Sequence, residues 1–220
     1  MDQPLKNPNA ILLRTRTFAA AVEPDNHGSE LDSRHVFADT RLNLKRTALL
    51  LIDVWETHPN DGWTARARPH IREKIVPLLA TAREHGLLIL HAAHEREIAG
   101  VAVPQPGEVD LCAEGLASTD AFEKFLKERE ITTLLYAGYA SNWCIINRPI
   151  GIIPMRGRGL NVILLRDCTL GFETPETLEG EWANKVIINT IEHQWGSTST
   201  LEDLQSALKM RAERRALRRE

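Results

Sequence analysis

Cysteine is scarce in this sequence, and its three cysteines are unevenly spaced. Cys112, Cys144 and Cys168 form neither a CxxC pair nor an even-numbered framework that disulfides could staple. We therefore expect reduced thiols, one of which can be chemically special.

Long hydrophobic runs are missing as well. No stretch approaches the roughly 18 to 20 apolar residues that a membrane helix needs. The opening residues, MDQPLKNPNA, lack the charged-then-apolar pattern of a secretory signal. These absences predict a soluble, cytoplasmic protein that does not use a membrane as a partner.

Neither sign of charge is in large excess. The sequence holds 27 Lys and Arg against 30 Asp and Glu, a formal net charge of −3. Such a balance gives no strong field to attract nucleic acid. The expected partner is a small-molecule substrate, with no nucleic acid.

What the chain does have is a series of apolar segments separated by helical patterns. With 220 residues and 43% hydrophobic content, it can bury one large core. Helical spacing of apolar residues covers 69–85, with Pro69 near the first turn, and 119–129. Apolar segments typical of buried strands cover 47–53, 87–90, 132–137 and 160–165. This alternation predicts an α/β fold, a three-layer α/β/α sandwich around a mostly parallel, twisted sheet.

The chain divides into three parts. Residues 1–40 read as an N-terminal arm that packs on the domain or on a neighbouring subunit, with an edge-strand pattern at 14–17 and a turn-rich stretch at 24–28. Residues 41–208 form the predicted domain. Residues 209–220 are a basic helical tail, interpreted as a solvated helix end or, alternatively, as a binding patch.

Ligands of parallel sheets bind beyond the carboxyl ends of the strands. Asp53 ends the first apolar segment, and Cys144 follows a glycine turn after the third and opens another helical segment. Free backbone N–H groups and the positive end of a helix dipole favour a thiolate at such a position. A buried, inert cysteine is the alternative interpretation.

The strand that ends in Asp53 and the later turn GYASNWCI (138–145) resemble the isochorismatase-like cysteine hydrolases. This superfamily includes nicotinamidases, N-carbamoylsarcosine amidohydrolase and biuret hydrolases, and the resemblance covers about residues 45–205. It implies hydrolysis of a small amide or other C–N carbonyl compound through an acyl-enzyme. Cys144 would be the nucleophile and Asp53 the base, and the N–H groups of Ala140 and Cys144 would hold the oxyanion. The resemblance further implies a homo-oligomer and a cis bond between Tyr139 and Ala140.

One family residue is missing. The position of the family's catalytic lysine aligns with Leu111, and no lysine occurs between Lys74 and Lys124. Either another cation serves, with His94 and Arg96 as candidates, or the chemistry differs, or catalysis has been lost. The last case predicts a non-catalytic relative that binds a small molecule or a partner in the same pocket.

Aromatic and polar residues near the two motifs could line the substrate pocket. Trp55, Trp63 and Trp143 suit a planar apolar wall, or equally the core, and Asn142 could orient a substrate or cap a helix. A zinc or iron site built from His58, His91 or His94 is an alternative, but the Asp-x-His spacing of the metal-binding relatives is absent, so no metal and no cofactor are assigned. The predicted pocket residues are Trp55, Tyr139, Asn142, Trp143, His94 and Arg96.

Overall fold

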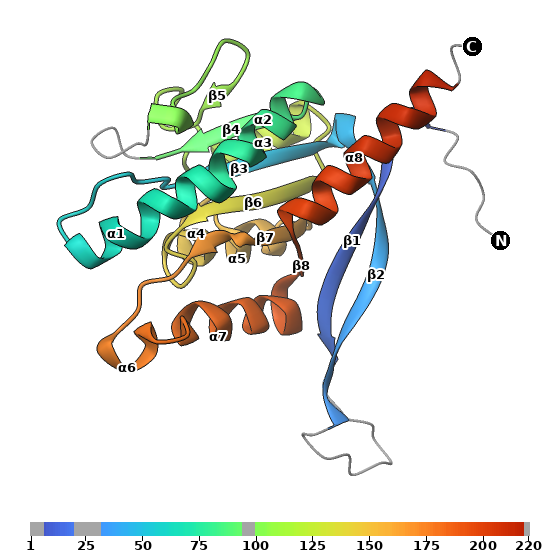
Figure 1. Ribbon diagram of the computed structural model, residues 1–220. Coiled ribbons are helices and arrows are strands. Elements are labelled where there is room, and N and C mark those ends of the chain that lie inside the picture. Colours follow the sequence, from blue (N-terminus) through green and yellow to red (C-terminus); the bar gives the residue numbers. More distant parts are fainter. Residues whose placement is uncertain (1–6, 20–31, 94–99, 218–220) are drawn as a thin grey trace.

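The computed structural model describes residues 7–19, 32–93 and 100–217. Within these ranges one sheet is formed in the strand order β2-β1-β8-β7-β6-β3-β4-β5 (Figure 1). Strands β3 to β8 run parallel to one another, and β1 is antiparallel to both β2 and β8. The strands are β1 (Ala10–Ala19), β2 (Arg34–Asn43), β3 (Thr47–Ile52), β4 (Leu88–Ala92), β5 (Val109–Asp110), β6 (Thr133–Tyr139), β7 (Asn161–Leu170) and β8 (Ser197–Ser199).

The four strands predicted from apolar segments are confirmed as β3, β4, β6 and β7. Every residue of β3 and of β6 is buried, because both strands lie inside the sheet and are covered on both faces. The predicted α/β sandwich with a mostly parallel sheet is therefore confirmed.

The helices cover both faces of the sheet. They are α1 (Asp61–His70), α2 (Val76–Glu84), α3 (Thr119–Glu128), α4 (Cys144–Asn147), α5 (Ile152–Gly157), α6 (Pro175–Leu178), α7 (Trp182–Thr190) and α8 (Leu201–Ala216). The first helical segment was predicted to begin near Pro69, and this prediction is wrong. It begins at Asp61, because the Asn60 side chain accepts a hydrogen bond from the Trp63 N–H and caps the first turn. A π-helical turn (Ile71–Ile75) then joins α1 to α2.

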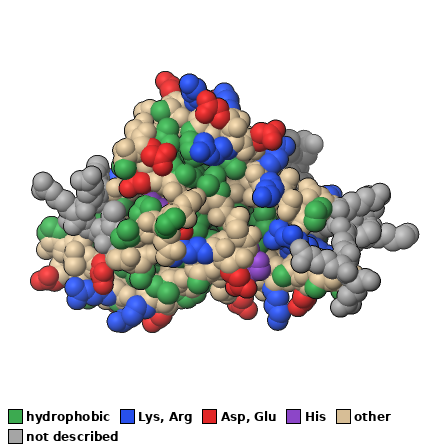
Figure 2. Space-filling view, turned by 90° about the horizontal axis from the view of Figure 1, so that it is seen from above, with side chains coloured by type: hydrophobic (Ala, Val, Ile, Leu, Met, Phe, Trp, Pro, Cys, Tyr) green, Lys and Arg blue, Asp and Glu red, His purple; other side chains and the backbone are tan. Residues whose placement is uncertain are grey.

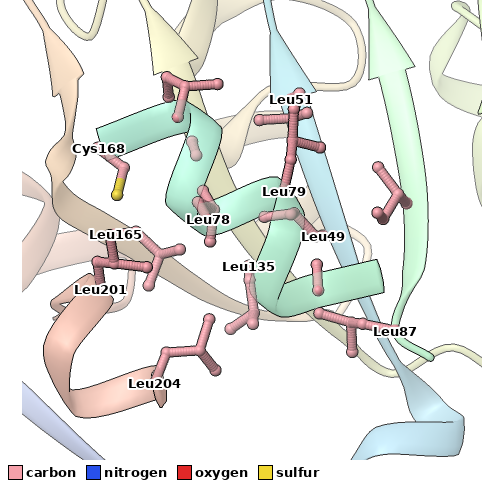
Figure 3. Packing of buried hydrophobic residues seen from close by; sticks show 14 of the residues in the cluster. Leu49, Leu51, Leu78, Leu79, Leu87, Leu135, Leu165, Cys168, Leu201 and Leu204 are labelled. Carbon is pink, nitrogen blue, oxygen red and sulfur yellow. The ribbon is translucent and has the colours of Figure 1, made fainter. Parts of the chain in front are cut away.

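Two hydrophobic cores lie on opposite faces of the sheet. Residues of α1, α2 and α8 fill the first, where Leu78 and Leu79 of α2 meet Leu49 and Leu135 of the strands (Figure 3). Residues of α3, α4, α5 and α7 fill the second. Helices on both sides fix the sheet, so the loops at its carboxyl edge are held on a rigid base.

The N-terminal segment is part of the sheet. The strand predicted at 14–17 is present within β1, but its predicted edge position is wrong: β1 lies between β2 and β8, with Arg16 opposite Thr198, and β2 is the edge. Ile11 and Leu13 are fully buried in the first core, which explains why β1 takes an interior place. The hairpin of β1 and β2 then extends away from the other strands (Figure 1). The turn predicted at 24–28 lies outside the described residues.

The described part of the basic tail continues α8 and ties it to the start of β1. Arg211 donates to the Pro8 carbonyl (3.0 Å) and Arg214 to the Ala10 carbonyl (2.9 Å). The interpretation as a merely solvated helix end is therefore wrong for these residues, since Arg211 is buried.

The surface carries charges of both signs. Lys and Arg side chains are interspersed with Asp and Glu side chains over the face in Figure 2. None of the helices in the described ranges is long and apolar enough to cross a membrane. The predicted homo-oligomer is a property of several chains and stays a prediction.

Candidate active site

Cys144 stands at the carboxyl edge of the sheet, in the turn after β6. A Cβ at Gly138 would lie 1.9 Å from the Ile52 carbonyl oxygen, so only glycine lets β6 approach the end of β3 this closely. Ala140 then takes a left-handed φ of 58°, and its carbonyl accepts hydrogen bonds from Trp143 and Ile145. This reversal of the chain sets Cys144 at the first position of α4.

The turn is fixed from the side of β7. The Ser141 N–H donates to the Leu170 carbonyl (3.0 Å), and the buried Ser141 hydroxyl lies 2.6 Å from Asn184 Oδ1 on α7. No cis peptide bond occurs in the described ranges, so the cis bond implied for Tyr139–Ala140 is not present.

Asp53 follows β3 and is completely buried. Its φ is 48°, and its N–H donates to the Ala92 carbonyl (3.1 Å) at the end of β4. Non-glycine residues in this left-handed region are uncommon and cluster at functional sites. The backbone thus adopts this uncommon conformation at Asp53, the residue that the resemblance implied as the catalytic base.

Arg148 supplies a cation to this site. Its Nη2 lies 3.0 Å from Asp53 Oδ1, and its Nη1 donates to the Ala92 carbonyl (3.0 Å). Arg148 directly follows α4, one turn after Cys144, and its N–H donates to the Cys144 carbonyl. The nucleophile candidate and the cation therefore lie at the two ends of the same short helix.

The acidity of Cys144 reflects these neighbours. Burial raises the pKa of its thiol to about 12, and the hydrogen bond to Asp53 and the negative charge of Asp53 act in the same direction, while Arg148 opposes them. These neighbours favour the neutral thiol, whereas the sequence predicted that the turn favours a thiolate. The helix that was expected to favour the anion has only four residues, so its dipole is weak beside the Asp53 carboxylate.

Leu111, the residue that aligns with the family's lysine, lies in an apolar environment. It is fully buried in the second core, against which the half-buried Cys144 also packs. Sequence reasoning missed Arg148, because it looked for the cation on a strand that precedes the cysteine. The available signal was the spacing of four residues from Cys144 to Arg148 just before a proline, which puts both on one face of a single helical turn.

The predicted oxyanion donors lie in the same turn. As the first residue of α4, Cys144 has an N–H with no acceptor inside the helix. In the described part of the chain, neither the Ala140 nor the Cys144 N–H donates to a backbone carbonyl outside the regular elements. Both groups are therefore available to a ligand oxygen, although their role stays a prediction.

Of the predicted pocket residues, Trp55 and Trp143 both lie near Phe172. The ring of Phe172 lies 6.4 Å from that of Trp55 and 5.4 Å from that of Trp143, and 4.3 Å from that of Trp63. Phe172 was not predicted, because nothing in the stretch after β7 marks it as aromatic wall. The predicted clustering of tryptophans is thus present, centred on a residue that the sequence did not single out.

Tyr139 and Asn142 are both engaged within the protein. Tyr139 is fully buried, and its hydroxyl lies 3.1 Å from His70 Nδ1. The Asn142 amide donates to the Phe172 carbonyl (2.9 Å) and accepts from the Phe172 N–H (3.0 Å). Asn142 therefore clamps the loop after β7, and α4 has no side-chain cap.

The histidines weighed as metal ligands have other partners. His91 Nε2 lies 2.7 Å from Glu108 Oε2, and Arg83 donates to both oxygens of Glu108. His58 Nδ1 accepts from the Asn60 N–H. Among the residues described, no group of three or more His, Cys, Asp or Glu is placed to hold a metal ion. His94 and Arg96 lie outside the described residues.

Comparisons with known proteins identify the fold. No protein-family model matches the sequence, and no curated protein matches it. A cysteine hydrolase from Pseudomonas syringae pv. phaseolicola has a TM-score of 0.60 at 17% identity over 77% of this chain and 95% of that one. An isochorismatase from Pseudomonas putida gives 0.53 at 14% identity (71% and 89% covered), and a nicotinamidase from Staphylococcus aureus gives 0.51 at 14% (71% and 99%). The chain has the fold of isochorismatase-family cysteine hydrolases, as the two motifs implied.

Proposed function

We propose that this protein is a cysteine hydrolase that cleaves a small amide or related C–N carbonyl compound, with Cys144, Asp53 and Arg148 as its catalytic residues. One observation carries the proposal. Arg148, which follows the helix that begins at Cys144, has its guanidinium 3.0 Å from the Asp53 carboxylate. The site thus has an acid, a thiol and a cation together, which is the set of groups that thiol-based acyl transfer requires.

In this proposal the thiol is neutral at rest, since the pKa of Cys144 is about 12 and its ordinary value is 9.0. Cys144 Sγ attacks the carbonyl carbon while its proton passes to Asp53, so the nucleophile is generated only during attack. Arg148 lies beside the carboxylate and reduces the cost of separating charge in a buried site. Arginine keeps its charge at any working pH, so the balance does not depend on a titrating lysine.

The carbonyl oxygen gains negative charge as the C–S bond forms, and the N–H groups of Ala140 and Cys144 are its proposed donors. Asp53 then returns the proton to the leaving nitrogen, and the C–N bond breaks to leave a thioester on Cys144. Water attacks the thioester with Asp53 as base, which releases the acid and restores the thiol.

The alternative of a non-catalytic relative rested on the missing cation. In this proposal Arg148, which follows α4, serves as the cation. Leu111, which aligns with the family's lysine, packs in the second core instead. The substrate pocket is proposed to include Trp55, Trp143 and the loop that Asn142 holds, while Tyr139 supports this wall from the core. His94 and Arg96 stay predicted pocket residues.

Trapping the acyl-enzyme tests this function. The protein is incubated with p-nitrophenyl acetate, quenched with acid and digested, and the three cysteine-bearing peptides are compared by mass spectrometry. We expect an acetyl group on Cys144 that turns over with time, and none on Cys112 or Cys168, which serve as internal controls. Equal labelling of all three, or full turnover by Cys144→Ala, would contradict the proposal.

A further inference from the structure

A hollow at the carboxyl edge of the sheet, which we call the aromatic groove, lies near the Cys144 turn. It has a volume of about 610 Å³ and runs between the start of α1 and the segment that joins β7 to α6. Its apolar walls are formed by Trp63, Phe172, Pro175 and Leu178. This volume lies within the range of small-molecule sites.

The charged side chains of the groove already have partners. Arg66 Nη2 donates to the Gly171 carbonyl (3.1 Å) and lies 3.5 Å from Glu181 Oε1. Both carboxylate oxygens of Glu173 accept backbone N–H groups, from Ala183 and Asn184 at the start of α7. What the groove offers to a ligand is therefore its apolar and aromatic surface, which suits an uncharged, ring-bearing group.

Phe172 links the groove to the Cys144 turn. It lines the groove, and its ring also contacts that of Trp143, the residue before Cys144, with 5.4 Å between ring centroids. Trp143 itself is 65% exposed, so it can also contact a ligand that lies in the groove. Two hydrogen bonds between the Asn142 side chain and the Phe172 backbone hold Phe172 against the Cys144 turn.

We infer that the aromatic groove binds an apolar, ring-bearing arm of the substrate whose carbonyl carbon is attacked by Cys144. This inference rests on the proposed hydrolase function and narrows its substrate class from small amides in general to amides that carry an aromatic or similarly apolar group. Burying such a ring removes apolar surface from water, which raises kcat/KM for the arylated amide over its methyl counterpart.

Phenylacetamide and acetamide are the matched probes, since they differ only by the ring. We expect the wild-type protein to prefer phenylacetamide by roughly tenfold or more in kcat/KM. Leu178→Glu places a charge on the groove wall at a side chain that is 50% exposed, and should lower that preference to about twofold. Val186→Glu is the control, because Val186 is 61% exposed on α7 and does not border the groove; its preference should equal that of the wild type.

Binding is measured apart from turnover, so that the two proposals fail separately. In Cys144→Ala, phenylacetamide should quench tryptophan fluorescence at lower concentration than acetamide, and Leu178→Glu should remove the difference. If neither amide is hydrolysed but this binding difference stands, the groove assignment holds and the proposed hydrolysis of these amides fails. Equal binding of both amides, or an unchanged preference in Leu178→Glu, overturns the groove assignment. So does a switch from dimer to monomer in Leu178→Glu with selectivity intact, since the groove would then be a subunit interface.

Discussion

The guanidinium of Arg148 lies 3.0 Å from the carboxylate of Asp53, and the two residues also share the Ala92 carbonyl as a hydrogen-bond acceptor. The three elements that carry the candidate site, β3, β4 and α4, are thereby joined at one point. Asp53 is completely buried and Arg148 is 16% exposed at its side chain, so the pair is held away from bulk water. An ion pair in such surroundings is costly to break on one side only.

Arg148 is expected to be indispensable for hydrolysis. Arg148→Met leaves Asp53 as a buried charge without its cation, so we expect a loss of roughly 100-fold or more in kcat and of about 3 kcal/mol in stability. Arg148→Lys keeps the charge but not the two-pronged contact, and should recover part of kcat. Steady-state kinetics and thermal melts measure both effects.

Arg156→Met serves as the control for that substitution, because Arg156 is an exposed arginine of the next helix. It should leave kcat and the melting temperature near wild type. A folded Arg148→Met protein with normal kcat would remove Arg148 from the mechanism.

Asp53→Asn is expected to move thiol reactivity and hydrolysis in opposite directions. The negative charge of Asp53 helps to hold the pKa of Cys144 near 12, so its removal lowers that pKa while Arg148 still favours the anion. Alkylation of Cys144 by iodoacetamide at pH 8 should therefore become faster. Hydrolysis should fall by about 100-fold or more, because no base remains to take the proton.

The rate of alkylation is followed for each cysteine by peptide mass spectrometry. Asp120→Asn makes the same acid-to-amide change at a side chain that is 86% exposed, and should alter neither readout. Slower alkylation of Cys144 in Asp53→Asn would mean that Asp53 does not act on the thiol.

The fold was predictable because its signals are local. The apolar runs of β3 and β6 are buried on both faces, so they are continuous in the sequence, and each ends at a residue that breaks the pattern, Asp53 or the glycine turn. The start of α1 was not predicted, because the residues that follow the cap at Asn60 show no helical repeat of apolar side chains. Pro69 is also a residue typical of a first helical turn, so the helix was expected to begin there. The place of β1 depends on pairing with β8, which lies some 180 residues later and leaves no local trace.

The candidate site was predictable only in part, for a similar reason. Cys144 and Asp53 follow strands whose ends meet at one edge of the sheet, so topology brings them together. The spacing of four residues places Arg148 on the same side of the helical turn as Cys144, but its contact with Asp53 depends on the fold and has no signal in the sequence. Phe172 and the Asn142 clamp depend on contacts of the turn before α4 with the segment after β7 and with α7, and no spacing in the sequence encodes these contacts.

Asn142→Ala is expected to loosen the loop after β7. The change removes two hydrogen bonds to the Phe172 backbone and leaves a half-buried N–H and C=O without their partners, at a cost of about 1 to 3 kcal/mol in stability. Because Phe172 borders the proposed substrate wall, KM should rise more than kcat falls. Kinetics together with urea unfolding separate these effects. Asn161→Ala, at a residue with only a 3.4 Å contact to Thr133, should change neither, and a purely stability-related defect in Asn142→Ala would contradict a role in the pocket.

Stability is expected to fall in mild acid because of His70. Burial lowers the pKa of His70 to about 4, while in the unfolded chain it titrates near its ordinary value of 6.5. The unfolded state therefore binds a proton before the folded state does, so the contribution to stability is complete above pH 6.5 and is lost as the pH falls toward 4. The full loss amounts to about 3 kcal/mol by this shift.

The neutral ring accounts for the contacts that His70 makes. Its Nε2 lies 3.2 Å from the Asp167 carbonyl oxygen, to which a neutral imidazole can donate, and its Nδ1 faces the Tyr139 hydroxyl. His70→Gln has no group that titrates in this range, so its free energy of unfolding should depend less on pH between 6.5 and 5 than that of the wild type. Urea titrations at closely spaced pH values measure this slope. These titrations stay above pH 5 to avoid the effect of Glu108. Burial would raise the pKa of Glu108, but hydrogen bonds from Arg83, Gln105 and His91 lower it to about 2. Glu108 therefore contributes a loss of stability only below pH 4.5. An identical slope in His70→Gln would show that the acid sensitivity arises elsewhere in the fold.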